Sequence, residues 1–269
     1  IDISALEITN ASKTQEQNGD WADYLFKRLQ RKGYLHRDCL RMVNRDRNVF
    51  AAMQLVAGKA DLMITGLTKT FRAAYEDIRM VLDPQPNKKV MGYSIVLEKN
   101  ETVFLADNSI TDRPTPEQLV KIAKQMAKRA RELGHTPRVA FVSYSTFGNP
   151  MSEITQIVRD AVSLMDQETV DFEYEGEMQV TPALDFDMMQ RNFPFSRLSG
   201  PANILIMPGL HAANISSRLI QHFAQGSVVG PQLLGLEQSV HIALMNAKVD
   251  DILTSAAIAA HAAVCRKAG

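Results

Sequence analysis

A hydroxyl-rich turn, Ser143-Tyr-Ser-Thr-Phe-Gly-Asn-Pro150, is the part of the sequence best suited to bind an anion. It follows an expected strand over 138–143 and precedes an expected helix over 152–165. Such a turn offers hydroxyls and free amide N–H groups at a helix N-terminus, which is an anion-binding arrangement. Ligands of open α/β sheets bind at the carboxyl ends of strands, where this turn would lie. Alternatively, Ser152 and its neighbours only cap the helix.

Two segments of small residues flank another expected strand, over 203–207. Ser199-Gly-Pro-Ala-Asn203 precedes it and His211-Ala-Ala-Asn-Ile215 follows it. Small residues let a ligand or a neighbouring backbone approach closely. These segments therefore indicate either a ligand site or tight packing.

Charged side chains gather in two further places. Asp171, Glu173, Glu175 and Glu177 alternate along the chain, which we interpret as the solvated face of a strand. Acid–base catalysis would require two of these carboxylates to lie close together. Residues 27–47 hold eight Lys or Arg residues, at 27, 28, 31, 32, 37, 41, 45 and 47. This stretch predicts a solvated helical face or a patch for a phosphate-rich ligand, but without interleaved aromatics it lacks a platform for single-stranded nucleic acid.

The composition excludes several classes of protein. The 269 residues carry 30 Lys+Arg and 30 Asp+Glu, and this neutrality argues against a general nucleic-acid or membrane-surface binder. Cys39 and Cys265 are too few and too far apart for a disulfide framework or a thiolate zinc site, and they fit a reducing cytoplasm. No apolar run approaches the ~18 residues of a membrane span. No histidine pair has metal-ligand spacing, and neither a P-loop nor G-x-G-x-x-G occurs.

Strand-like and helix-like segments alternate along the chain. Helices are expected over 20–32, 45–57, 69–82, 116–134, 152–165, 212–224 and 249–265, and strands over 61–65, 90–97, 102–106, 138–143, 170–174, 203–207, 233–236 and 240–244. Thr115-Pro-Glu-Gln118 is a strong helix start. Asp83–Lys89, with two prolines and no apolar residue, is the best linker. This alternation predicts an α/β fold with a largely parallel sheet.

Nine segments in this order resemble the phosphotransacetylase (phosphate acetyl/butyryltransferase) family. They are Arg31–Gly33, Ala60–Gly66, Phe104–Asp107, Val142–Gly148, Glu175–Gln179, Gly200–Ile206, Asn214-Ile215, Gly230-Pro231 with Gly235-Leu236, and Val249–Ile252. Further segments resemble one branch, the C-terminal phosphotransacetylase-like domain of bacterial NADP-dependent malic enzymes. Those segments are Arg37–Cys39, Asn44–Arg47, Ser145–Gly148, Asp171–Tyr174 and Phe195–Ala202.

The resemblance implies two α/β domains with a ligand cleft between them, the second domain inserted into the first. Carried over, the first domain covers 1–86 and 227–269, and the insert covers 87–226. The first domain is expected to lack its N-terminal part, because the family begins with further strand–helix units before Ala5–Asn10. A malic-enzyme domain, which would carry NADP and a divalent metal, is expected to precede those units.

Departures from the family pattern bear on function. Active members carry a Ser-Arg-Gly triplet before the last helix, but this chain has Leu244-Met245-Asn246 there. The general-base position on that helix is retained as Asp251, while a further family arginine falls at Glu76. Acyl transfer to phosphate needs cations to hold the dianion, and losing one such donor costs ~100–1000-fold. The resemblance therefore implies no intact catalytic set.

These points predict a catalytically degenerate domain. It would bind acetyl-CoA or CoA in the interdomain cleft, regulate the attached malic-enzyme domain and form a homodimer, with no cofactor, metal, nucleic acid or membrane of its own. The expected ligand-binding residues are Ser143, Tyr144, Ser145, Thr146, Gly148, Gly200, Asn203, Asn214 and Asp251. An alternative is an active phosphate acetyltransferase, converting acetyl-CoA and phosphate to acetyl phosphate and CoA, that recruits Arg72 or Arg79. A third is nucleic-acid binding through 27–47, which would be steeply salt-dependent.

Overall fold

The computed structural model describes residues 7–11, 15–98, 101–223 and 227–268. The helices are α1 (Gln15–Leu29), η2 (Gln30–Lys32), α2 (His36–Arg45), α3 (Arg47–Val56), α4 (Phe71–Val81), α5 (Pro116–Glu132), α6 (Glu153–Met165), α7 (Val180–Leu184), α8 (Phe186–Asn192), α9 (Leu210–Phe223) and α10 (Val249–Ala268). The strands are β1 (Leu62–Gly66), β2 (Met91–Glu98), β3 (Glu101–Ala106), β4 (Arg138–Val142), β5 (Glu173–Met178), β6 (Ile204–Ile206), β7 (Ser227–Leu234) and β8 (Ser239–Ala243).

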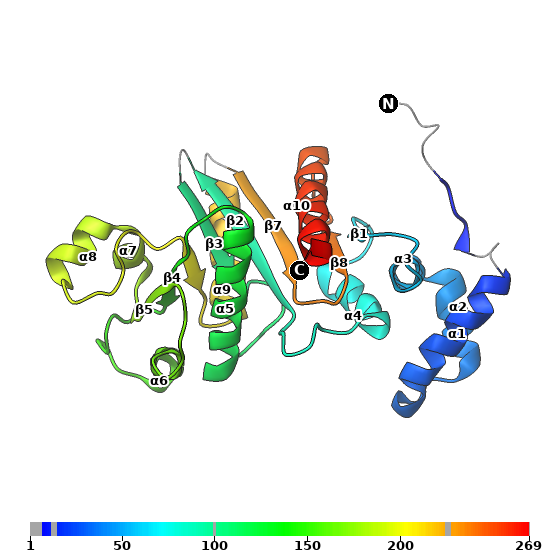
Figure 1. Ribbon diagram of the computed structural model, residues 1–269, viewed down its shortest axis with the longest axis horizontal. Helices are drawn as coiled ribbons and strands as arrows, with labels where there is room; N and C mark the ends of the chain where they lie inside the picture. The colour runs from blue at the N-terminus through cyan, green and yellow to red at the C-terminus, as the bar shows by residue number, and fades with distance from the viewer. Residues whose placement is uncertain (1–6, 12–14, 99–100, 224–226, 269) are drawn as a thin grey trace.

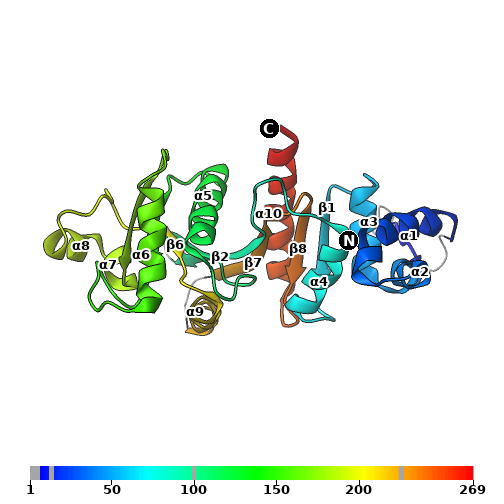
Figure 2. The same ribbon diagram turned by 90° about the horizontal axis from the view of Figure 1, so that it is seen from below.

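The large sheet has the order β5-β4-β6-β3-β2-β7 and is covered on both faces. Side chains alternate across a strand. In β4, Val139 and Phe141 therefore pack against α5 and α6, whereas Ala140 and Val142 pack with α7, α8 and α9. Figure 2 shows α5 and α6 on one side of this sheet and α9 on the other. Pairing is parallel among β5, β4, β6 and β3, and antiparallel from β3 to β2 and from β2 to β7.

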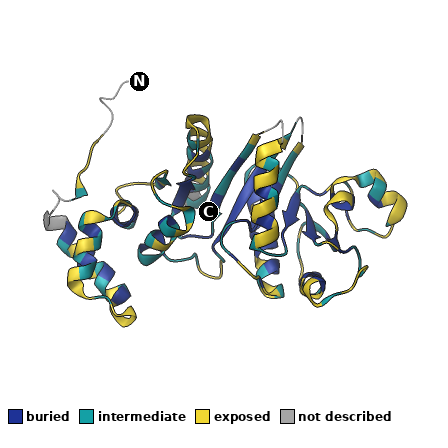
Figure 3. Ribbon diagram, turned by 180° about the vertical axis from the view of Figure 1, so that it is seen from behind, coloured by how far each residue is buried: buried dark blue, intermediate teal, exposed yellow. Residues whose placement is uncertain are grey.

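The small sheet consists of β1 and β8, which pair in parallel from Leu62–Ser239 to Gly66–Ala243. On one face, Val240 and Ile242 join a core with α1 to α4. On the other face lies α10, whose Ala259 carbonyl accepts a hydrogen bond from Ser239 Oγ. The molecule is elongated, with α1 and α2 at one end and α8 at the other (Figure 1). Figure 3 shows the strands mostly buried and the outer helix faces exposed.

Several expected elements are confirmed. α5 begins at Pro116 and is capped by Thr115 with Gln118, the capping box expected from its sequence. Ser152 caps α6, as the sequence also indicates. The parallel α/β class is confirmed, since four of the six paired strand couples are parallel. No helix in the described part of the chain combines the length and apolar character needed to cross a membrane.

Other elements differ from the sequence-based expectation. The helix expected over 45–57 is confirmed as α3, which begins at Arg47 because Asp46 accepts hydrogen bonds from the N–H groups of Asn48 and Val49, but α2, which precedes it, was not expected. The strand expected at 170–174 begins only at Glu173, and the one expected at 233–236 is the end of β7. β7 pairs with β2 in the large sheet, so the chain crosses to the small sheet after Leu234 rather than at 227.

Candidate functional site

Two small adjoining cavities lie where α9, β7 and the start of α10 meet. They measure about 30 and 20 Å³ and share Gln221, Val228 and Gly230. The first is also lined by His241, Ala243, Leu244, Asn246, Ala247, Asp251 and Ser255, and the second by Ser94, Asn108, Ser109, Asn214, Ser217, Arg218 and Pro231. The first cavity thus lies on the seam between the two sheets, and the second adjoins it on the side of the large sheet, which makes this seam the candidate site.

The turn between β8 and α10 forms one wall of the seam. Leu244 and Asn246 line the cavity, whereas Met245 is 62% exposed. Asp251 is exposed in the first turn of α10, where its carboxylate accepts a hydrogen bond from the Lys248 N–H at 2.8 Å. The three positions implied by the family triplet therefore adjoin Asp251 but present neither a hydroxyl nor a cation.

His241 lies on β8 at the base of the first cavity. It is 3% exposed, and its Nδ1 atom is buried without a hydrogen-bond partner among the described residues. Burial lowers the pKa of His241 to about 4, because the charged imidazolium loses its hydration. The side chain is therefore neutral at physiological pH. Nothing in its sequence context distinguished it from the other histidines.

A buried polar group lies under α9 in the second cavity. Asn108 Nδ2 donates to Ser94 Oγ at 2.7 Å and to Ser217 Oγ at 3.3 Å. Asp107 precedes it and accepts hydrogen bonds from the N–H groups of Gly92 and of the following turn. This group is not among the ligand-binding residues expected from the sequence. Asp-Asn-Ser after a strand is, however, a typical turn signal that indicates polar side chains at this position.

The charge of the site is low. Among the described residues that line the two cavities, Arg218 is the one Lys or Arg, and Asp251 is the one carboxylate. Arg218 is exposed and donates to Gln221 Oε1 at 3.1 Å. Arg72 pairs with Glu76, and Arg79 bonds to the Leu82 carbonyl. Neither α4 arginine lines the seam cavities.

The Ser143–Gly148 turn, with Tyr144 53% exposed, does not present the free N–H groups that the sequence predicts. Ser145 Oγ and the Gly148 N–H both donate to Glu177 Oε1, at 2.6 and 2.9 Å. Thr146 Oγ1 accepts a hydrogen bond from the Gln179 N–H at 3.1 Å. A buried carboxylate of the chain itself thus takes the place of an external anion. The turn also lies at the end of β4, two strands from β3, and none of its residues lines the seam cavities.

The interpretation of the acidic segment as a solvated strand face is wrong. Glu175 is 4% exposed and Glu177 is 1% exposed. Glu175 forms a salt bridge of 3.0 Å with Arg197 and also accepts the Arg197 N–H. The alternating carboxylates on β5 therefore serve to anchor two loops.

Gly200 and Asn203 lie at the opposite end of the large sheet from the Ser143–Gly148 turn. Asn203 precedes β6, where its Oδ1 accepts the Arg138 N–H and its Nδ2 donates to the Thr136 carbonyl. A Cβ atom on Gly200 would lie 3.2 Å from Arg138 Nε. The structure thus brings Asn214 and Asp251 to adjoining cavities and separates them from the other expected ligand residues.

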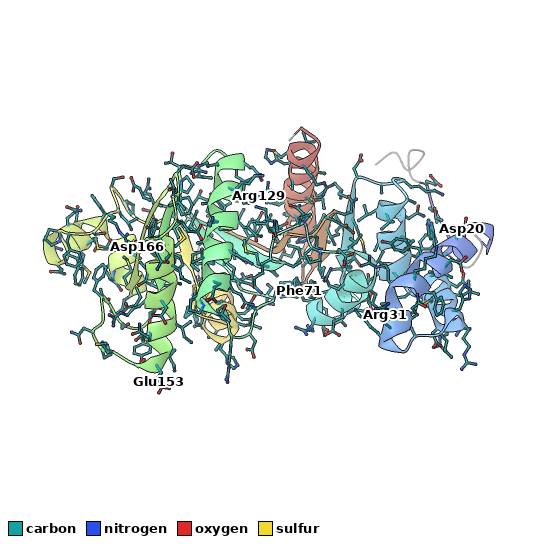
Figure 4. The ribbon with its side chains drawn as sticks, turned by 60° about the horizontal axis from the view of Figure 1, so that its bottom comes forward. Asp20, Arg31, Phe71, Arg129, Glu153 and Asp166 are labelled. Carbon is teal, nitrogen blue, oxygen red and sulfur yellow. The ribbon has the colours of Figure 1, made fainter. Side chains whose placement is uncertain are left out.

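The basic stretch 27–47 lies beyond α3 and α4, at the far end of the molecule from the large sheet. Figure 4 shows Arg31 near that end and Arg129 between α5 and α10. Arg28 is engaged with Asp83 at 2.7 Å. The stretch contributes no residue to the seam cavities. No group of three or more His, Cys, Asp or Glu suited to a metal ion is found in the part of the chain that the structure describes.

Comparison with known proteins gives one consistent family. A family model described as phosphate acetyl/butaryl transferase matches residues 1–260. An NADP-dependent malic enzyme of Rhizobium meliloti is 47% identical over 261 residues, covering 97% of this chain and 34% of the relative. A phosphate acetyltransferase of Helicobacter pylori is 25% identical over 261 residues, covering 97% of this chain and 50% of that protein. The chain therefore spans about a third to a half of these curated relatives.

Among solved structures, the EutD phosphotransacetylase from Staphylococcus aureus matches with a TM-score of 0.84 and 26% identity. The match covers 98% of this chain and 80% of that one. The family resemblance carried by the nine motifs is thereby confirmed, as is the fold that it implies.

Proposed function

Because the chain belongs to the phosphate acetyl/butaryl transferase family, we propose that it is a catalytically degenerate member that binds acetyl-CoA or CoA at the seam. In this proposal the unit of the small sheet, 1–86 with 235–269, and the unit of the large sheet, 87–234, act as two domains around the site. Asn214, Arg218 and Asp251 take part in binding the ligand from α9 and α10.

One observation carries the assignment as degenerate: the shortage of positive charge at the two small cavities. A phosphate nucleophile is a dianion at neutral pH, and its transfer requires preorganised cations. Arg218 is the one cation among the described lining residues, and the positions of the family Ser and Arg hold Leu244 and Met245. Asp251 alone can accept a proton but cannot hold phosphate. The two cavities therefore lack the cations that acyl transfer to phosphate requires.

The alternative of an active acetyltransferase depends on recruited arginines. Arg72 is engaged with Glu76 at 2.6 Å on an exposed face of α4. Arg79 bonds to the carbonyl at the end of its own helix. Both arginines would have to leave these partners and cross to the seam, which favours the degenerate assignment.

The small size of the cavities supports a regulatory role. A cavity of about 30 Å³ has room for only a few water-sized molecules. A pantetheine arm must therefore separate α9 from α10 in order to enter. A ligand that binds only the opened seam shifts the protein towards that arrangement, which is what an effector requires.

The malic-enzyme relatives suggest what the bound ligand would regulate. In a longer chain of their kind, this domain would sense acetyl-CoA and bias an attached catalytic domain, which itself would hold NADP and a divalent metal. Ligand binding would change how the two sheet units are arranged at the seam, and this change would alter the attached catalytic domain. Self-association is part of the proposal, since Ile215, Leu219 and Phe223 form an exposed apolar stripe on α9.

The direct test of degeneracy is a coupled thiol-release assay with acetyl-CoA and phosphate. An active phosphotransacetylase serves as the positive control under the same conditions. We expect a rate at least ~100-fold below that control, because at least one transition-state donor is absent. Turnover within a few-fold of the control would establish the active acetyltransferase instead.

A further inference from the structure

A third and larger cavity lies on the same seam, at the opposite end of α10. It measures about 290 Å³ and lies between α5, the linker before β2, the end of β7 and the last turns of α10. At about 1.5 Å per residue, Asp251 and Arg266 are separated by about 22 Å along the helix. The large cavity is therefore distinct from the site proposed above for acetyl-CoA.

Positive charge predominates among the described residues that line this cavity. Lys88 comes from the linker, Lys128 and Arg129 from α5, and Arg266 from α10, against the single carboxylate of Glu132. The whole chain has zero net charge, so this excess of positive charge is local to the cavity and does not reflect a basic composition. An unfilled cluster of like charges is unfavourable, and an anion would relieve the repulsion.

Arg129 is the buried centre of the cluster. It is 2% exposed and is fixed by Tyr93 OH at 3.0 Å, Glu132 at 3.1 Å and the Ile258 carbonyl at 3.1 Å. Those bonds use three of the five N–H groups of a guanidinium, so donors remain. Figure 4 shows Arg129 between α5 and α10. Its bond to Ile258 already ties the large-sheet unit to α10.

The other cations are less fully engaged. Lys128 is 3.9 Å from Glu132, a carboxylate that it shares with Arg129. Lys88 forms no salt bridge with another described residue and is exposed at the rim. Burial lowers the pKa of Arg266, while the field of Asp61 acts in the opposite direction. The side chains of Gln85, Gln125 and Gln238 complete a polar lining.

We propose that this cavity binds a small polyanion, carrying two phosphate or carboxylate groups, that bridges Lys128 and Arg129 on α5 to Arg266 on α10. The ligand would hold the two sheet units together at this end of α10. It would therefore oppose an opening of the seam at the other end, where Asp251 and Ser255 lie.

Calorimetric titration of the chain in low-salt buffer tests this site, with inorganic pyrophosphate in one arm and malonate in the other. The two arms distinguish phosphate from carboxylate groups as the source of charge. We expect saturable binding of at least one probe. Lys128→Gln and Arg266→Gln should each weaken it about tenfold, since each removes one charge-assisted contact.

Arg31→Gln is the matched control, because it removes the same charge from an exposed position at the far end of the molecule. It should leave the affinity for the probe unchanged, and so should Arg218→Gln at the other cavity. Absence of saturable binding at millimolar concentrations of both probes would overturn the proposal. If only one of Lys128→Gln and Arg266→Gln weakened probe binding, the ligand would not bridge α5 and α10. This outcome does not depend on whether the chain binds acetyl-CoA.

Discussion

At the scale of single residues, the most informative finding is that carboxylates on a strand can be buried by the loops they anchor. Glu177 accepts hydrogen bonds from Ser145 and Gly148, and its Oε2 lies 3.6 Å from Arg159 Nε. A solvated face and a buried anchor have the same alternating sequence pattern. Glu177 is buried because hydrogen-bond donors from a distant turn, Ser145 and Gly148, pack against it. The sequence around Glu177 does not encode the position of that turn.

Glu177→Gln should destabilise the chain by roughly 2–4 kcal/mol, because it removes the charge that satisfies two buried donors beside Arg159. The measurement is the free energy of unfolding in urea. Glu101→Gln, an exposed change of the same kind on β3, should cost less than about 0.5 kcal/mol. Similar costs for the two variants would show that Glu177 does not anchor the turn.

His241 should impose a pH dependence on stability. Its pKa is about 4 in the folded chain against 6.5 for the free side chain, so between these values only the unfolded chain is protonated there. The free energy of unfolding should therefore fall as pH drops from 6.5 to 4, by up to about 3 kcal/mol from this group.

Denaturant titrations across that pH range measure the effect. His241→Asn should flatten the slope, whereas His222→Asn, at an exposed position on α9, should leave it unchanged. Parallel profiles for the chain and for His241→Asn would contradict the lowered pKa.

At the scale of elements, local signals account for the helices that carry their own caps. Thr115-Pro-Glu-Gln118 fixes the start of α5 because the cap bonds are made within four residues. α2 went unpredicted because its buried side chains are only Cys39 and Val43 in a stretch of charges. α7 and α8 are short, at 5 and 7 residues, and depend on tertiary packing rather than on periodicity.

The contact between β1 and β8 gives a sharp prediction at this scale. Gly66 has φ +123°, and a Cβ atom there would lie 2.0 Å from the Ala243 carbonyl oxygen. Gly134 also has a positive φ, +86°, but no atom within 4 Å of a Cβ. Gly66→Ala should therefore cost roughly 3–5 kcal/mol of unfolding free energy and Gly134→Ala only roughly 1–2.

Chemical denaturation of the two variants side by side measures that difference. Both positions carry a penalty for positive φ, larger at +123°, so the gap between the two variants reports the contact with Ala243 together with that difference in backbone strain. Equal costs would mean that β1 and β8 do not approach as closely as described.

At the scale of the whole molecule, the family motifs predicted more of the fold than of the site. They placed Asn214 and Asp251 at adjoining cavities, but they also grouped the Ser143–Gly148 turn and Asn203 with them. The turn follows β4 and Asn203 precedes the neighbouring parallel strand β6, so the two lie at opposite ends of the sheet, and a linear motif does not show which end is near the seam. The buried, neutral state of His241 depends on three-dimensional packing, which its sequence context does not encode.

Calorimetric titration of the chain with acetyl-CoA tests the central claim most directly. We expect saturable binding below about millimolar ligand, weakened about tenfold by Arg218→Gln, which removes a cation lining the second cavity. Arg72→Gln, an equal charge change on an exposed face of α4, should leave the affinity unchanged. No detectable binding at millimolar acetyl-CoA, or equal affinity in the chain and Arg218→Gln, would contradict the assignment of the seam as an acetyl-CoA site.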